Sequence, residues 1–195
     1  MPPVATQADE PGQVPATVID RSRRKRGSNE EAHTDVITLV LGGARSGKSA
    51  LAERLAADAG DDVVYVATAE VVDDDDFAAR VAAHRARRPA SWWTVESGAD
   101  LPATLRGLPA GRTLLVDSLG TWVARCPDFA ADGLALAESL APHHAVVVSE
   151  EVGLGVHPET EVGRRWRDAI GEVNQVVAAA ADRVVLVVAG RALEL

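Results

Sequence analysis

The chain has 195 residues, of which 47% are hydrophobic, and its formal net charge is −9 at pH 7. This length and composition suffice for one domain with a full core, whereas the acidic charge argues against nonspecific binding to nucleic acid, which requires a basic surface. The single cysteine, Cys126, excludes an internal disulfide framework, and no apolar run reaches the roughly 18 residues of a membrane span, so we expect a cytoplasmic protein.

Residues 1–35 differ in composition from the rest of the chain. They contain four prolines, no aromatic residue and a basic cluster at 21–26. Such a segment cannot bury enough apolar surface to offset the entropy that it would lose on ordering. The cluster is compatible with an arm for an anionic partner, but a dispensable, disordered leader is the simpler interpretation. We therefore expect a single domain over 36–195, preceded by this leader.

A phosphate-binding loop is the most informative motif. The sequence GGARSGKS at 42–49 matches the pattern G-x-x-x-x-G-K-[ST], with an apolar run before it and a helix-forming run after it. Lys48 would reach the β- and γ-phosphates, and the Ser49 hydroxyl would ligate Mg²⁺. A plain glycine-rich turn is the alternative, but the chain has only two lysines and one stands here. We expect a nucleoside triphosphate to bind through Gly42, Gly43, Ala44, Arg45, Ser46, Gly47, Lys48 and Ser49.

Apolar runs alternate with helical patterns along the rest of the chain. Besides the strand before the phosphate loop, we expect strands at 63–67, 91–95, 113–116, 145–148 and 184–188, with a short edge strand at 193–195. Besides the helix after that loop, we expect helices from about 77 to just before Pro89, and at 100–106, 131–140 and 159–181. These strands show almost no polar alternation, which indicates burial on both faces. The predicted fold class is therefore α/β: a phosphate-loop NTPase-like, mostly parallel β-sheet with helices on both faces.

Polar residues cluster at the predicted carboxyl ends of these strands, where such sheets bind their ligands. Thr68, Asp117 and Ser149 all fall there, together with the phosphate loop. Asp117 is suited to hold Mg²⁺ through water or through Ser49. The alternative is an ordinary strand-end aspartate that caps the following helix.

Residues 150–158 form a second candidate segment. The chain leaves a strand with Glu150 and Glu151, followed by Gly153 and Gly155, which allow a close backbone approach to a ligand. A structural turn would explain the glycines but not the two carboxylates. On these residues alone, a structural turn and a substrate-binding loop that uses Glu151, Gly153 and Gly155 are equally open.

Residues 80–89 form a third candidate segment. His84 lies on a predicted helix among arginines, whose charge favours the neutral and nucleophilic form of the imidazole. From these residues alone, an exposed helix histidine is the simpler interpretation. Arg80, Arg87 and Arg88 are either exposed to solvent or bind the triphosphate.

The motifs follow one another in a specific order along the chain. They are GGARSGKS at 42–49, YVAT at 65–68, Ala79-Arg80 with His84 and Arg88-Pro89, Glu151-Val152-Gly153 with Gly155 and Pro158, and Arg167-Asp168 with Gly171, Asn174 and Gln175. The series resembles the bifunctional adenosylcobinamide kinase / adenosylcobinamide-phosphate guanylyltransferase family of cobalamin biosynthesis. The resemblance implies that a nucleoside triphosphate phosphorylates adenosylcobinamide and that GTP then transfers GMP to the phosphate, giving adenosylcobinamide-GDP and pyrophosphate.

The resemblance also implies roles for single residues. His84 is the expected nucleophile, which carries GMP as a phosphoramidate, while Lys48 and the loop neutralise the leaving pyrophosphate. It implies Mg²⁺ held by Ser49 and Asp117, GTP and ATP as substrates, adenosylcobinamide and its phosphate as partners, and a homotrimer. Beyond the phosphate loop, we expect the nucleotide site to include Thr68, Arg80, Arg88, Glu96 and Asp117.

The chain departs from some relatives at three places. Ala83 and Glu150 stand where some have histidine and asparagine, and the stretch from Asp117 to Ala145 is short. Two other functions remain open: a kinase for another small alcohol, which would not use His84, and a non-catalytic nucleotide switch whose leader engages a partner. The enzyme is preferred because His84 and the loop at 151–158 have no role in a plain switch.

Overall fold

A seven-stranded sheet forms the centre of the computed structural model, which describes residues 36–69 and 88–195. The expected leader and the expected helix near Phe77 lie outside the described residues. The strand order is β3-β2-β4-β5-β1-β6-β7, and every neighbouring pair is parallel except β6 and β7. The strands are β1 (Ile37–Gly42), β2 (Val63–Ala67), β3 (Trp93–Glu96), β4 (Thr113–Asp117), β5 (His144–Glu150), β6 (Arg183–Val188) and β7 (Arg191–Glu194).

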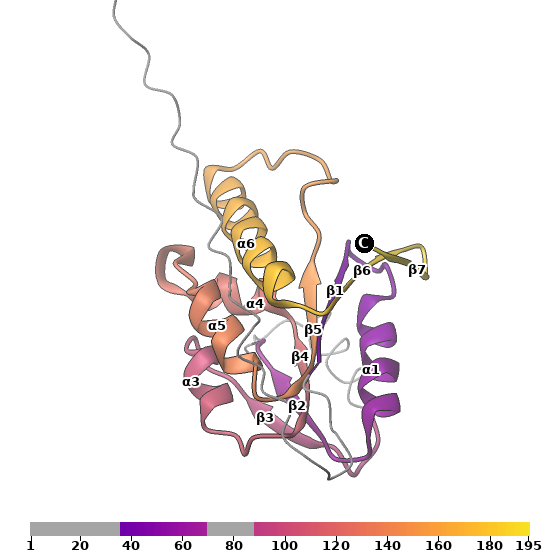
Figure 1. Cartoon of the computed structure of the whole chain (residues 1–195). Coiled ribbons are helices and arrows are strands. Elements are labelled where there is room, and N and C mark those ends of the chain that lie inside the picture. Colours follow the sequence, from indigo (N-terminus) through magenta and orange to yellow (C-terminus); the bar gives the residue numbers. More distant parts are fainter. Residues whose placement is uncertain (1–35, 70–87) are drawn as a thin grey trace, which may run out of the picture.

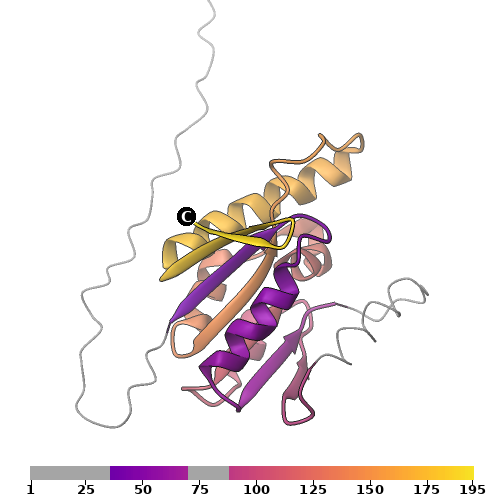
Figure 2. The ribbon, with the colours of Figure 1, turned by 90° about the vertical axis from the view of Figure 1, so that its right-hand side faces the viewer.

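Helices cover both faces of this sheet, as expected. Helix α1 (Lys48–Ala59) packs on one face, and the other helices among the described residues pack on the opposite face (Figures 1 and 2). The latter group comprises α3 (Leu101–Arg106), α4 (Leu119–Arg125), the short 3₁₀ helix η2 (Pro127–Phe129), α5 (Gly133–Leu140) and α6 (Glu161–Ala180). The predicted fold class, an α/β sheet of the phosphate-loop NTPase type, is therefore confirmed.

Two buried clusters explain why the central strands read as continuous apolar runs. Along β1, Leu39 belongs to the core under α3–α6, whereas the next residue, Val40, belongs to the core under α1. Successive side chains of a strand point to opposite faces, so a strand buried on both sides has no polar positions to alternate. On α1 the small side chains of Ala52 and Ala56 are fully buried against the sheet.

Most element boundaries agree with the sequence prediction within one or two residues, and the differences have local causes. The helix expected from Ala131 begins at Gly133, because the Asp132 side chain accepts a hydrogen bond from the N–H of Ala135 and caps it there. Likewise α6 begins at Glu161 because Thr160 is its N-cap. Helix α4 was not predicted, since seven residues are too few to show a helical period. Within 36–69 and 88–195, no helix combines the length and apolar character needed to cross a membrane.

Candidate functional site

The phosphate loop joins β1 to α1 at the carboxyl edge of the sheet. Gly47 is the N-cap of α1 and has φ 97°, a left-handed conformation that glycine adopts without steric cost. The N–H of Gly190, in the turn between β6 and β7, donates to the carbonyl of Ser46 at 2.8 Å. The loop is therefore tied to a second part of the sheet, and it places the amino end of α1, where anions bind favourably, at this edge.

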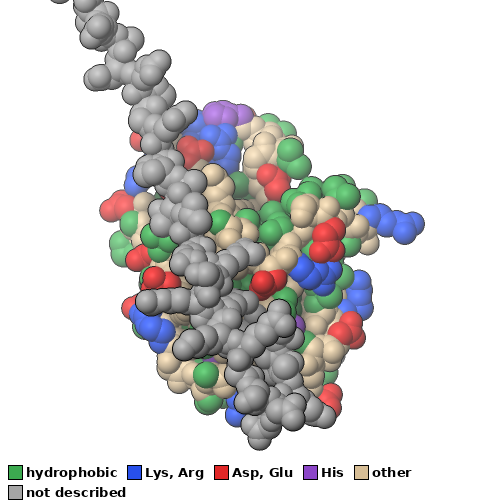
Figure 3. Space-filling view, in the orientation of Figure 1, with side chains coloured by type: hydrophobic (Ala, Val, Ile, Leu, Met, Phe, Trp, Pro, Cys, Tyr) green, Lys and Arg blue, Asp and Glu red, His purple; other side chains and the backbone are tan. Residues whose placement is uncertain are grey.

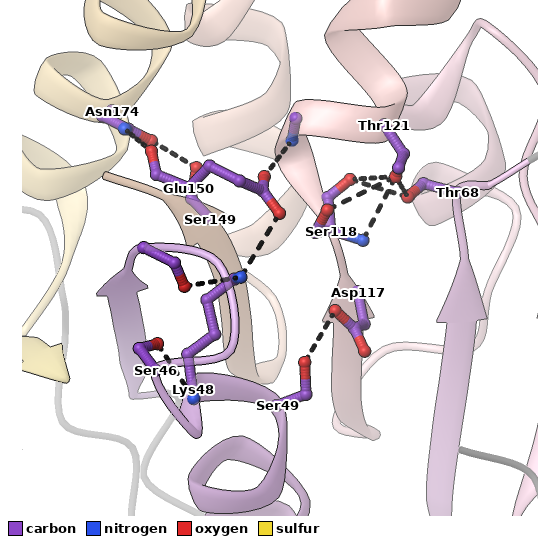
Figure 4. A network of polar contacts seen from close by, with 12 residues as sticks. Ser46, Lys48, Ser49, Thr68, Asp117, Ser118, Thr121, Ser149, Glu150 and Asn174 are labelled. Carbon is purple, nitrogen blue, oxygen red and sulfur yellow. Dashed lines mark hydrogen bonds and ion pairs between the residues drawn. The ribbon is translucent and has the colours of Figure 1, made fainter. Parts of the chain in front are cut away.

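Lys48 lies between the phosphate loop and the end of β5. Its ammonium donates to the carbonyl of Gly43 at 3.4 Å and lies 3.6 Å from a carboxylate oxygen of Glu150 (Figure 4). The other carboxylate oxygen of Glu150 accepts a 2.9 Å hydrogen bond from the N–H of Gly120, the second residue of α4. Only 13% of the Lys48 side chain is exposed, so its reach is confined to this edge of the sheet.

Asp117 ends β4 and faces the first turn of α1. The Ser49 hydroxyl donates to its Oδ1 at 3.5 Å, and the phenol of Tyr65 on β2 donates to its Oδ2 at 3.2 Å. Burial, and then the charge of Asp117, raise the pKa of Tyr65, so its O–H stays protonated as a donor. The N-cap of α4 is Ser118, so Asp117 does not cap the following helix.

Thr68 connects the ends of β2 and β4. Its fully buried hydroxyl donates to the carbonyl of Ser118 at 2.6 Å and lies 2.5 Å from the hydroxyl of Thr121. The guanidinium of Arg125 donates to the carbonyls of Thr68 and Ser97, at 3.1 and 2.8 Å. These bonds fix the chain at the point where it leaves β2, immediately before the segment that carries Arg80 and His84.

Arg88 and Glu96 border an open hollow of about 530 Å³ beside the edge strand β3. The guanidinium of Arg88 lies 3.6 Å from the centre of the Tyr65 ring, whose hydroxyl contacts Asp117. The structure thus brings Arg88 to the carboxyl edge that also carries the phosphate loop. Arg80 and His84 lie outside the described residues.

The loop at 151–158 lies directly beside the phosphate loop. The N–H of Glu151 donates to the carbonyl of Gly42 at 3.2 Å, while its carboxylate accepts hydrogen bonds from the N–H groups of Gly153 and Leu154. Glu151 therefore closes its own turn. Gly155 and the neighbouring apolar side chains are exposed. Figure 3 shows charged and histidine side chains around this end of the molecule, over the start of α6.

Several contacts of the site were not predicted from the sequence. These are the pairing of Glu150 with Lys48, the bond from Tyr65 to Asp117, and a network in which Asn174 joins α6 to β5. The Asn174 amide donates to the carbonyl of Glu150 at 3.0 Å and accepts from the Ser149 hydroxyl at 2.5 Å. Asn174 did carry a recognisable signal, because it is a polar residue at helical spacing among buried apolar positions of α6.

The described side chains offer few ligands for a metal. No three histidine, cysteine, aspartate or glutamate residues converge anywhere in 36–69 or 88–195. The pair formed by the Ser49 hydroxyl and the Asp117 carboxylate consists of two hard oxygen donors at the phosphate loop. This suits Mg²⁺, which takes few protein ligands and completes its shell with water and phosphate oxygens.

Comparison with known proteins gives a consistent result. A family model described as cobinamide kinase / cobinamide phosphate guanyltransferase matches residues 38–195. The bifunctional adenosylcobalamin biosynthesis protein CobP of Pseudomonas aeruginosa is 48% identical over 161 residues, which span 78% of this chain and 92% of that protein. The protein CobU of Salmonella typhimurium, of the same description, is 37% identical over 177 residues, spanning 80% of this chain and 97% of its own.

Solved structures are more distantly similar. The flagellar accessory protein FlaH of Methanocaldococcus jannaschii is 13% identical with a TM-score of 0.48, and the match covers 83% of this chain and 78% of FlaH. The P4 protein of bacteriophage phi6, solved with ADP, is 20% identical with a TM-score of 0.41, and the match covers 81% and 54% of the two chains. The strand order and the loop between β1 and α1 define the fold of this chain.

Proposed function

The chain belongs to the cobinamide kinase / cobinamide phosphate guanyltransferase family, and we propose that its phosphate loop forms the triphosphate site for both reactions. The protein is a bifunctional enzyme of cobalamin biosynthesis. It phosphorylates adenosylcobinamide with a nucleoside triphosphate. It then transfers GMP from GTP to that phosphate, releasing pyrophosphate and giving adenosylcobinamide-GDP.

One contact beside the phosphate loop supports the proposed site most directly, and it joins the start of α1 to the end of β4. Ser49 follows Lys48 at the start of α1, and its hydroxyl reaches Asp117 across the edge of the sheet at 3.5 Å. Lys48 would bind the β- and γ-phosphates, and Ser49 and Asp117 would hold Mg²⁺, directly or through water. The metal, when bound, neutralises charge on the phosphates. The protein groups orient the triphosphate and confine it to this edge.

His84 is the residue that we assign to GMP transfer, on the basis of the family resemblance. Its neutral imidazole would attack the α-phosphorus of GTP, so that an N–P bond forms while the bond to the pyrophosphate oxygen breaks. Cobinamide phosphate would then displace the imidazole. Arg88, four residues further on, lies over Tyr65 next to the Asp117 pair, which is consistent with His84 working near this edge.

The remaining assignments follow the same family. We propose that Thr68, Arg80, Arg88 and Glu96 complete the nucleotide site, and that the turn made by Glu151, Gly153 and Gly155 contacts the substrate. We also propose one catalytic domain over 36–195 behind a dispensable leader, a homotrimer and a cytoplasmic location. A single, buried cysteine, Cys126, is compatible with a reducing compartment.

Labelled GTP tests the proposal. The purified protein is incubated with Mg²⁺ and GTP labelled at the α- or the γ-phosphate, then denatured and examined for an acid-labile, base-stable label. We expect retained α-label in the wild type and none in His84→Ala, which should still bind nucleotide. Lys48→Ala should lose both the label and the kinase activity, because triphosphate binding is lost. Absence of α-label from a wild type that binds GTP would exclude His84 as the nucleophile.

A further inference from the structure

Glu150 occupies a central position in the site. It is the last residue of β5, the strand between β1 and β4, and its carboxylate lies between the ammonium of Lys48 and the start of α4 (Figure 4). Oε1 lies 3.6 Å from the ammonium of Lys48, and Oε2 accepts the 2.9 Å bond from Gly120. None of the roles assigned above uses this carboxylate.

Three elements hold the carboxylate in place. Its backbone carbonyl accepts from Asn174 on α6, and its Oε2 is bound to the start of α4. The indole of Trp166 donates to the carbonyl of Gly120 at 3.1 Å and so fixes that end of α4. A Cβ at Gly120 would collide with Oε2 and would lie 2.8 Å from Cδ of Glu150. The close approach that positions Glu150 therefore requires glycine at 120.

If this site only had to bind a nucleotide, the negative charge of Glu150 would be unfavourable. A triphosphate brings several negative charges to Lys48, and a carboxylate 3.6 Å from the same ammonium competes for it and repels the phosphates. A glutamine of the same shape could accept the same hydrogen bond from Gly120 without this repulsion. A carboxylate can do one thing here that a glutamine cannot, which is to take up a proton.

We propose that in this chain, unlike relatives with asparagine at this position, Glu150 is the proton acceptor of the kinase step, an inference that rests on the function proposed above. When Lys48 pairs with the phosphates, Oε1 is released while Oε2 stays bound to Gly120. The substrate hydroxyl oxygen attacks the γ-phosphorus and forms the new O–P bond as the bond to the β,γ-bridging oxygen breaks. The hydroxyl proton passes to Oε1, and the nucleoside diphosphate leaves.

The second reaction has no need of this group. The nucleophile toward the guanylylated protein is the phosphate of cobinamide phosphate, which is already ionised near neutral pH and brings no hydroxyl proton to remove. Loss of a proton acceptor should therefore impair only the kinase reaction. Damage to the shared triphosphate site should impair both reactions.

The test compares Glu150→Gln with Glu138→Gln, a control that removes the same charge from an exposed residue of α5 outside the site. Four quantities are measured on the full chain: kcat and nucleotide KM for phosphorylation of cobinamide, labelling of the protein by α-labelled GTP, and GMP transfer to supplied cobinamide phosphate. We expect Glu150→Gln to lower the kinase kcat by about 100-fold or more, with nucleotide KM unchanged or lower. Labelling and GMP transfer should be retained, and Glu138→Gln should resemble the wild type.

Three outcomes would overturn the inference. A kinase kcat in Glu150→Gln equal to that of the wild type, with tighter nucleotide binding, would make Glu150 only a counter-ion of Lys48. Equal losses in both reactions would make it part of the shared triphosphate site. Failure of Glu150→Asp, which keeps a carboxylate, to recover more kinase activity than Glu150→Gln would also contradict proton transfer. A wild type that neither phosphorylates cobinamide nor takes the label would instead contradict the proposed function.

Discussion

Replacement of Gly120 by alanine tests whether the close contact between α4 and Glu150 is as tight as the structure shows. The new methyl group would collide with the Glu150 carboxylate and would lie 3.1 Å from the ring of Trp166. The carboxylate is the end of a flexible side chain and can move away. It would then lose its hydrogen bond from the Gly120 N–H and its position beside Lys48.

The expected cost combines a lost hydrogen bond to a charged group with strain against a bulky ring. Both contributions lie in the range of about 1–3 kcal/mol, and relaxation of the side chain reduces their sum, so we expect the free energy of unfolding to fall by about 2 kcal/mol. For a domain of this size this corresponds to a decrease in Tm of about 4–8 °C. Urea denaturation and thermal unfolding measure the two quantities directly.

Gly171 provides the matched control. It lies inside α6, and no described atom comes within 4 Å of a Cβ placed there. Alanine at 171 should therefore stabilise the protein by about 0.5–1 kcal/mol through helix propensity. Equal effects of the two substitutions would refute the argument. The second test introduces Gly120→Ala into a Glu150→Ala background, where there is no carboxylate to collide with. If Gly120→Ala lowers the free energy of unfolding there as much as in the wild type, the argument is also refuted.

Three further predictions concern other parts of the protein. Tyr65→Phe removes the donor to Asp117, and we expect the Mg²⁺ concentration for half-maximal activity to rise about tenfold; an unchanged Mg²⁺ dependence would separate this bond from metal binding. Asn174→Ala leaves the buried Ser149 hydroxyl without its acceptor and should cost about 1–3 kcal/mol in urea denaturation, whereas Gln175→Ala on the exposed side of α6 should cost little. Two hydrogen bonds from Arg183 lower the pKa of Glu194 below its ordinary 4.5. The wild type should therefore be more stable than Glu194→Gln above pH 4.5, and this difference should disappear as the pH falls through the lowered pKa. A difference that persisted in acid would contradict this assignment.

The elements of the fold were largely predictable because their causes are local. The strand at Val63–Ala67 is a continuous apolar run, and the short helix after Asp100 carries its own cap, since that side chain accepts from the N–H of Ala103. Helix α4 was missed for a complementary reason. Its seven residues pack on the sheet through Leu119 and Trp122, and this burial stabilises a segment too short to reveal itself by period.

The candidate site was predictable only where one stretch of chain carries the chemistry. The phosphate loop is such a stretch, and so the sequence alone predicted a triphosphate site there and, through the order of its motifs, the family, which the matching family model confirms. The tertiary structure decided which carboxylate faces Lys48: Glu150 reaches it, while its neighbour Glu151 closes a turn. It also decided the partner of Tyr65, which lies 52 residues from Asp117 in the sequence. These pairings depend on the order of strands in the sheet, which brings β2, β4 and β5 to one edge, and on a glycine that lets α4 approach β5. A sequence pattern records neither, because both arise from contacts between segments far apart in the chain.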